Sequence, residues 1–336
     1  MIRFRNQDEY RQYLYKRDLR KTANGLGIVL LVIFALEIIL AAVLTMILRL
    51  SGQDILSGDS ELSLIENGLL SAIMFFVVTL IYVLIKRRSL GALFPFEKIG
   101  AKKLAMLCVI GTALSLMSNF APHLLTEAFG LFGVTNSGGT FSFAGDPPSV
   151  LIYFLTVAIL PACMEEFAFR GVIMGSLRKY SDALALVVSA ALFALMHGNF
   201  VQIPFTFCCG LVFGFLVLKT DSLLPAILVH FLNNGLSVTF DLLYEYKILS
   251  AGLVNLLYGA IIMITGILGL IFIRSFVKED ENFFRLGKAD EGIPYRVKLK
   301  TVAGSPTLIS FAVIMLLFSV YVLILPYLVQ WGVIRY

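Results

Sequence analysis

Charged residues are scarce in this 336-residue sequence. Asp, Glu, Lys and Arg make up 15% of it and hydrophobic residues 59%, whereas soluble domains carry about 25% charged residues. This balance excludes a soluble globular protein and predicts a polytopic protein of the lipid bilayer. The net charge of +5 does not indicate nucleic-acid binding, because the basic residues lie in connections between apolar runs.

Cysteine and histidine are also few. The four cysteines, which lie in apolar runs without metal-ligand spacing, are interpreted as reduced packing residues (Cys108, Cys163, Cys208 and Cys209). No serine or cysteine lies where a base could activate it, and no His-Glu-x-x-His sequence occurs. Two of the three histidines fall within residues 160–234, which directs attention to that stretch.

Apolar runs of bilayer length predict an all-α transmembrane bundle of about nine spans. The expected spans are 24–48, 66–85, 103–127, 149–177, 182–198, 201–218, 222–243, 251–273 and 304–330. The fifth and sixth are near the lower length limit and are predicted to form a hairpin that turns at Gly198-Asn199. Gly210 and Gly214 are a small-xxx-small pair, which favours close helix contact.

Basic residues predict the orientation of the bundle. Of the 27 Lys and Arg residues, 23 fall in connections on the side of the N-terminus, and Arg49, Lys247 and Arg335 on the other side. Because Lys and Arg favour the cytoplasmic side, the N-terminus is expected to be cytoplasmic. The predicted organisation is a juxtamembrane segment (1–23), accessory helices (24–147), a core (148–245) and C-terminal helices (246–336) with a cytoplasmic loop (274–303).

Three of the middle spans carry polar residues at one depth. At 1.5 Å per residue, Glu165, His197 and His230 lie about 16–22 Å from the cytoplasmic ends of their spans. Ionisable residues inside a membrane are functional-site hypotheses by default. Glu37, in the first span, is expected to form an interhelical pair or to contact a cavity.

Helical spacing separates the roles of the two adjacent glutamates. Glu166 and Arg170 are four residues apart and are predicted to form an ion pair on one helix face, which leaves the carboxylate of Glu165 free. The same spacing puts His230 and Asn234 on one face, and it puts Phe193 beneath His197.

This set of groups suits the hydrolysis of an amide bond. A desolvated carboxylate can take a proton from water, and His197 can help to position that water. His230 and Asn234 can donate hydrogen bonds to an oxyanion. We expect Glu165, His197, His230 and Asn234 to surround one water-accessible cavity.

Zinc is the competing account of these residues. Glu165, His197 and His230 are an adequate ligand set. Ligating histidines usually donate their other nitrogen to a carboxylate or similar partner, and Arg170 is expected to occupy Glu166, the only such carboxylate in view. A metal-free glutamate mechanism without a cofactor is therefore favoured, and zinc is left open.

The motifs Glu-Glu-x-x-x-Arg, Phe-x-x-x-His and His-x-x-x-Asn, in this order, resemble those of the CPBP (ABI, CAAX-protease-like) intramembrane endopeptidases. The resemblance covers about 148–245. It implies that Glu165, together with His197, activates water. It also implies His230 and Asn234 as oxyanion donors and Glu166–Arg170 as a structural pair.

The resemblance also implies a peptide or membrane-protein substrate and, for this chain, a bacterial plasma membrane. Two alternatives are kept: a non-catalytic immunity or scaffold protein, and a proton-coupled transporter. The sequence indicates neither the particular substrate nor the oligomeric state.

Overall fold

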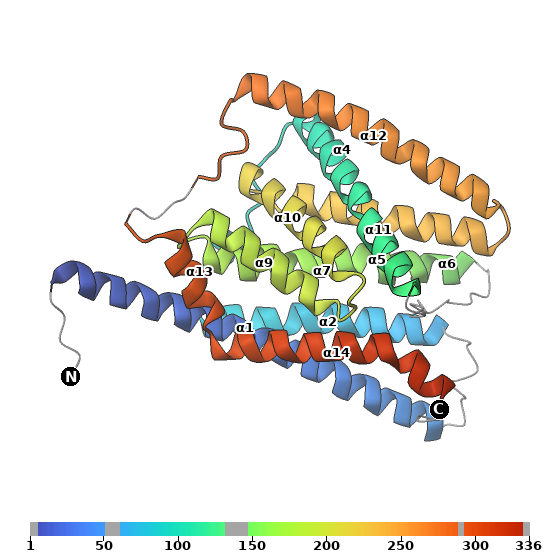
Figure 1. Cartoon of the computed structure of the whole chain (residues 1–336), viewed down its shortest axis with the longest axis horizontal. Coiled ribbons are helices and arrows are strands. Elements are labelled where there is room, and N and C mark those ends of the chain that lie inside the picture. The colour runs from blue at the N-terminus through green and yellow to red at the C-terminus, as the bar shows by residue number, and fades with distance from the viewer. Residues whose placement is uncertain (1–5, 51–60, 132–146, 288–291, 332–336) are drawn as a thin grey trace.

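A computed structural model describes residues 6–50, 61–131, 147–287 and 292–331, and these residues are helical apart from turns and one isolated β-bridge between Phe96 and Ser222 (Figure 1). The long helices are α1 (Gln7–Leu50), α2 (Glu61–Ile85), α4 (Ala101–Ser118), α9 (Asp182–Met196), α10 (Ile203–Thr220), α11 (Leu224–Glu245), α12 (Ala251–Glu279) and α14 (Pro306–Gln330). Shorter ones are α3 (Leu90–Leu93), α5 (Phe120–Gly130), α6 (Pro147–Tyr153), α7 (Leu160–Glu166), α8 (Gly175–Leu177) and α13 (Tyr295–Ala303). Two π-helical segments, η2 (Phe154–Ile159) and η3 (Phe167–Met174), flank α7.

The all-α membrane bundle is confirmed. The described residues form eight helices that are long and apolar enough to cross a membrane. The remaining expected span, 182–198, is also a helix, but α9 has only 15 residues. At 1.5 Å per residue it extends about 22 Å, less than the ~30 Å hydrocarbon core of a bilayer. Much of α9 is buried inside the bundle.

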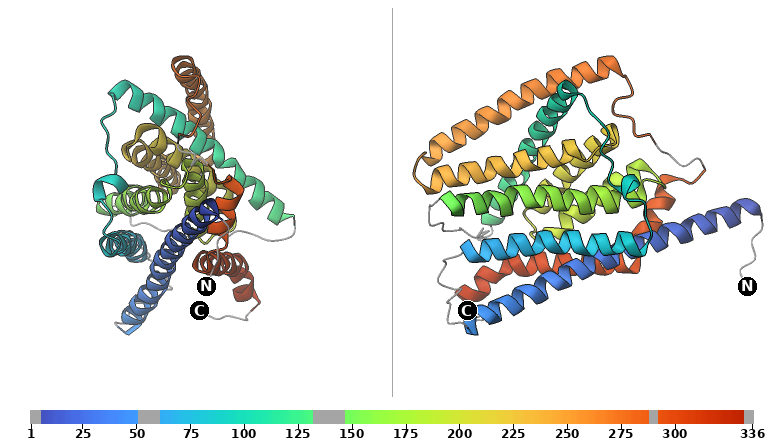
Figure 2. Two further views of the ribbon diagram at one scale, coloured as in Figure 1. Left: turned by 90° about the vertical axis from the view of Figure 1, so that its left-hand side faces the viewer. Right: turned by 180° about the vertical axis from the view of Figure 1, so that it is seen from behind.

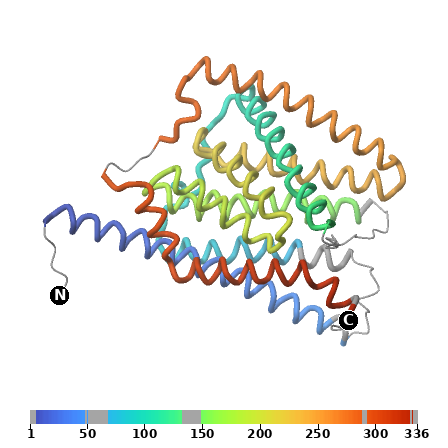
Figure 3. The backbone as a smooth tube through the Cα atoms, viewed as in Figure 1, coloured from blue at the N-terminus to red at the C-terminus, as the bar shows by residue number. Residues whose placement is uncertain are grey.

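Most of the long helices run roughly along the longest axis of the molecule, and α4 and α10 cross it obliquely. The start of α1 and the end of α14 lie at opposite ends of the bundle (Figures 1 and 2). The tube in Figure 3 shows that α1 and α14, the first and last long helices, lie side by side, and the two helices contact each other.

The first helix shows how an apolar helix divides between core and lipid. Leu19, Ala23, Leu26, Leu30 and Ile33 are three or four residues apart, so they share one face, and all five are completely buried. The opposite face of α1 is also apolar but exposed, as expected for a helix in contact with lipid. The helix begins at Gln7, so most of the predicted juxtamembrane segment 1–23 is part of it.

The predicted loop 274–303 likewise contains regular structure. It includes the end of α12 and all of α13. Lys298 of α13 is buried, and its Nζ donates to the carbonyl of Tyr180 at 3.0 Å. The hydroxyl of Tyr180 in turn lies 2.7 Å from a carboxylate oxygen of Asp18 on α1. Three connections that were predicted to lie on one side of the membrane are thus in contact.

The small-xxx-small pair on α10 makes the close contact predicted for it. A Cβ placed on Gly210 would lie 2.9 Å from the Cα of Ala190, and one on Gly214 would lie 2.5 Å from the side chain of Leu186. Only glycine lets α10 approach α9 this closely. The turn between the two helices contains Gly198 at φ +59°, a left-handed conformation that favours glycine.

Candidate active site

The two glutamates lie at the end of α7, between the π-helical segments η2 and η3. π-Helical turns are rare and occur frequently at functional sites. Pro161 in the first turn of α7 has no N–H, so it cannot donate to the carbonyl of Val157 four residues earlier. The side-chain amide of Asn234 donates to this carbonyl at 3.1 Å instead, which ties α11 to the irregular helix.

Glu166 accepts two charge-assisted hydrogen bonds through one oxygen. Its Oε1 lies 2.8 Å from Arg170 Nη1, which is the predicted i,i+4 ion pair, and 2.9 Å from Nδ1 of His230. The expectation that Arg170 would leave Glu166 unavailable to a histidine is therefore wrong. A carboxylate oxygen can accept from more than one donor, and α11 brings His230 to the same oxygen.

The guanidinium of Arg170 is enclosed by polar and aromatic groups. Its side chain is fully buried, and Nη2 donates to the carbonyl of Gly210 at 3.2 Å. Its Cζ lies 4.4 Å from the ring centroid of Phe193 and 5.2 Å from that of Phe213. An ion pair, a carbonyl and two aromatic rings thus offset the cost of burying the positive charge of Arg170.

His197 is oriented by its own helix. It is the residue directly after α9, and its Nδ1 lies 2.9 Å from the carbonyl oxygen of Phe193. A carbonyl only accepts, so Nδ1 carries the proton of the neutral ring and Nε2 keeps a lone pair. The ring of Phe193 meets the imidazole edge-on with centroids 4.8 Å apart, as its predicted place beneath His197 requires.

Glu165 faces both histidines. Its Oε2 lies 3.9 Å from Nε2 of His230, and among the described residues this oxygen accepts no hydrogen bond. Glu165 and His197 line a cavity of about 190 Å³ together with Glu37 of α1 and Ser71 of α2. The structure thus brings three helices of the predicted core together and adds two polar residues from the accessory helices.

Asn234 and Glu165 line two different cavities of the described residues, whereas the sequence predicts one cavity around all four residues. Asn234 lines a cavity of about 620 Å³. His197 lines both cavities, and His230 is buried beside them. The reason is that Asn234 is one helical turn beyond His230 and is held by the Val157 carbonyl.

The larger cavity contains polar residues that the sequence did not single out. Asn233 lines it and donates through Nδ2 to Oδ1 of Asn234 at 3.2 Å. The third histidine, His123, lines it from α5, and Asp241 lines it from α11. The sequence gave no indication that these residues share a cavity, because they are far apart in the chain or on different helices. The packing of α5 against α10 and of α4 against α11 brings the helices together.

The described residues contain no group of three His, Cys, Asp or Glu side chains placed to hold a metal ion. Glu165, His197 and His230, the zinc set kept open above, are therefore not assembled as ligands. Glu166 is bonded to His230, so one of the two histidines has the carboxylate partner that ligating histidines usually have.

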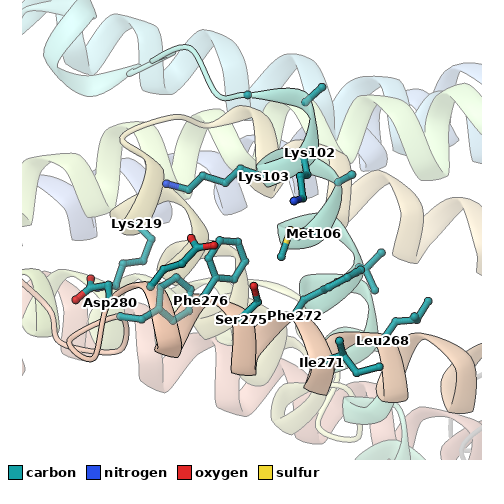
Figure 4. Close-up of a pocket in the computed structure, with 16 residues that line it drawn as sticks. Lys102, Lys103, Met106, Lys219, Leu268, Ile271, Phe272, Ser275, Phe276 and Asp280 are labelled. Carbon is teal, nitrogen blue, oxygen red and sulfur yellow. The ribbon is translucent and has the colours of Figure 1, made fainter.

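A cavity of about 990 Å³ lies away from this cluster, between α4, α10 and α12 (Figure 4). Lys102 and Lys103 of α4 and Lys219 of α10 project toward it, and Phe272 and Phe276 of α12 form part of its apolar wall. It contains none of the predicted site residues, so volume alone does not identify the reactive site.

Comparisons with known proteins match the same part of the chain. Residues 147–236 match the family described as "Type II CAAX prenyl endopeptidase Rce1-like". A stretch of 99 residues is 36% identical to "Membrane-embedded CAAX protease MroQ" of Staphylococcus aureus (strain USA300), covering 27% of this chain and 40% of that relative. The chain therefore aligns with less than half of the relative's length. No solved structure matches the chain.

Proposed function

We propose that this protein, which belongs through residues 147–236 to the CPBP (CAAX protease-like) family, is an intramembrane endopeptidase that activates water with Glu165. The observation that carries the proposal is the placement of Glu165 in a polar cavity beside His197 and 3.9 Å from His230, while the neighbouring Glu166 is bonded to Arg170. One carboxylate is thus free to act as a base and the other is not.

The reaction begins with a water molecule between Glu165 and His197. Glu165 takes a proton from this water, and the lone pair of His197 Nε2 accepts its other hydrogen. The water oxygen attacks the carbonyl carbon of the peptide. Glu165 then returns the proton to the leaving nitrogen, the C–N bond breaks, and a carboxylic acid and an amine are released. No residue is consumed, and no covalent intermediate forms.

His230 and Asn234 stabilise the negative charge on the tetrahedral oxygen. His230 already donates Nδ1–H to Glu166, so it can donate to the oxyanion only when Nε2 is protonated as well. Asn234 has a second amide hydrogen besides the one given to Val157. Both donors are fixed in place before substrate binds, which favours stabilisation of developing charge.

The substrate is a peptide or membrane protein that enters the 620 Å³ cavity. Amides and other polar side chains line this cavity, including Asn233, Asn255 and Gln202, and these can pair with an extended peptide backbone. The family description and the relative's name both refer to CAAX substrates, so a prenylated C-terminal peptide is one substrate class to include. The proposed location is a bacterial plasma membrane.

The test compares membranes that contain wild-type protein with membranes that contain Glu165→Gln, using mass spectrometry of released peptides. We expect cleavage products with the wild type alone, and equal amounts of folded protein for both. A prenylated CAAX peptide and its unprenylated form, incubated with the purified protein, separate the substrate classes. Products that persist in Glu165→Gln would exclude Glu165 as the base, and their absence from both samples would favour a scaffold.

A further inference from the structure

The residue of interest lies outside the segment that matches the family. Glu37 is in the C-terminal half of α1, and its Oε1 accepts a hydrogen bond from the hydroxyl of Ser71 on α2 at 2.7 Å. This bond confirms the interhelical pair expected for Glu37. Among the described residues, Glu37 takes part in no ion pair.

An interhelical hydrogen bond alone would explain a buried polar pair in a membrane. However, Glu37 and Ser71 also line the 190 Å³ cavity that contains Glu165 and His197. A polar pair that served only to join α1 to α2 could lie anywhere along the two helices. Here the pair lies at the same depth along the bundle as Glu165, the proposed base, and lines the same cavity.

The cavity has the size and polarity that bound water requires. A water molecule occupies about 30 Å³ in the liquid and needs two to four polar partners. Four polar side chains, two of them carboxylic, face this volume, and the remaining lining is apolar. Glu37 has a second carboxyl oxygen beyond the one bonded to Ser71. Because Glu165 and His197 take both hydrogens of the water, this oxygen holds the water as a donor, with Glu37 protonated.

We propose that Glu37, held by Ser71, is a positioning residue that fixes the water molecule which Glu165 activates. This inference rests on the proposed function. It assigns a role to α1 and α2, which lie outside the matched core. The two helices line the cavity that holds this water molecule. Glu37 acts through the water and does not itself take the proton.

The first arm of the test measures turnover for four purified proteins: wild type, Glu37→Gln, Glu37→Leu and Ser71→Ala. Glutamine keeps both hydrogen-bonding positions, so kcat should stay within a few-fold of wild type. Leucine removes them, and kcat should fall about 100-fold with KM nearly unchanged, because misplacing a reactant by about 1 Å costs that much. Ser71→Ala should give an intermediate loss.

The second arm detects the water independently of cleavage. X-ray radiolysis converts bound water to hydroxyl radicals, which oxidise adjacent side chains. Met196 lines the cavity and should be oxidised in wild type and Glu37→Gln, and much less in Glu37→Leu. Met315, with 1% of its surface exposed, is the internal control that should stay unmodified.

The outcomes separate this inference from the proposed function. Loss of turnover in Glu37→Gln as complete as in Glu165→Gln would overturn positioning and make Glu37 a base. Wild-type kcat in Glu37→Leu, or unchanged Met196 oxidation, would also overturn it. If the wild type cleaves nothing, the proposed function fails, while the oxidation of Met196 still decides whether Glu37 holds water there.

Discussion

Glu166 serves two buried partners at once, and this makes it different from its neighbour. Arg170 and His230 both bond to the same oxygen, and neither side chain has more than a few per cent of its surface exposed. Removing the negative charge leaves a buried guanidinium without its counter-ion. The two adjacent glutamates therefore respond differently to the same substitution.

We expect Glu166→Gln to lower the free energy of unfolding by about 3–5 kcal/mol, the usual cost of removing one member of a buried pair. Glu165→Gln should unfold at nearly the wild-type temperature, because the only ionisable partner of its carboxylate among the described residues, His230, is 3.9 Å away. Thermal unfolding in detergent measures both. A stable Glu166→Gln beside an unfolded Glu165→Gln would show that the roles are reversed.

A double variant distinguishes the loss of a charge partner from the loss of packing. Glu166→Met combined with Arg170→Met removes both charges and keeps the volume approximately. It should be more stable than Glu166→Gln alone, because an apolar pair often replaces a buried ion pair at little cost. A double variant as unstable as the single one would mean that the His230 bond carries most of the stabilisation.

Metal dependence concerns Glu165, His197 and His230, the alternative set of zinc ligands. With no three-ligand group among the described side chains, proteolytic activity should survive exhaustive dialysis against a strong chelator, and elemental analysis should find less than stoichiometric zinc. Activity that disappears on chelation and returns with zinc alone would make Glu165 a ligand, or the base acting on metal-bound water.

At this scale, spacing within one helix was predictable and contacts between helices were not. The i,i+4 rule gave the Glu166–Arg170 pair and the place of Phe193 beneath His197. It could not give the bond from His230 to Glu166, since the two residues are 64 positions apart. Nor could it give the pairing of Glu37 with Ser71, which depends on how far α1 is rotated toward α2.

At the scale of elements, the approach of α10 to α9 positions the groups around Arg170. Gly210 permits the approach and also supplies the carbonyl that Arg170 bonds. An added methyl group would meet the backbone of Ala190, which cannot move aside as a flexible side chain could.

Gly210→Ala should therefore destabilise the protein by about 1–3 kcal/mol, the range for overpacking. Gly266→Ala on α12 is the matched control, because no atom lies within 4 Å of its added Cβ. It should be neutral or stabilising by up to ~1 kcal/mol, since alanine favours a helix over glycine. Equal effects of the two substitutions, measured by thermal unfolding, would contradict the close packing of α9 and α10.

Hydropathy predicted most elements but not their irregularities. Apolar runs located the long helices because a bilayer requires about 20 apolar residues in each. The same rule placed this span at 182–198, whereas α9 ends at Met196, directly before His197. The π-helical segments on both sides of α7 had no sequence signal beyond Pro161, because helix periodicity is read as 3.6 residues throughout.

At the scale of the whole molecule, the short α9 makes membrane topology the sharpest test. The distribution of 23 basic residues against three predicts a cytoplasmic N-terminus and an external C-terminus if all nine helices cross. A fluorescent protein fused to the N-terminus should be bright in the cytoplasm, and alkaline phosphatase fused after residue 336 should be active outside. A cytoplasmic C-terminus would mean that α9 does not complete a crossing.

The pairing of α1 with α14 has a consequence for how the chain is made. Ribosomes add about 5–20 residues per second, so roughly 15–55 s separate the synthesis of the buried stripe on α1 from that of α14. During this interval α2 can already bind α1, but the contacts of α1 with α13 and α14 do not yet exist. The helix that carries Glu37 is made before the other described helices, yet it acquires its full set of neighbours only when α14 has been made.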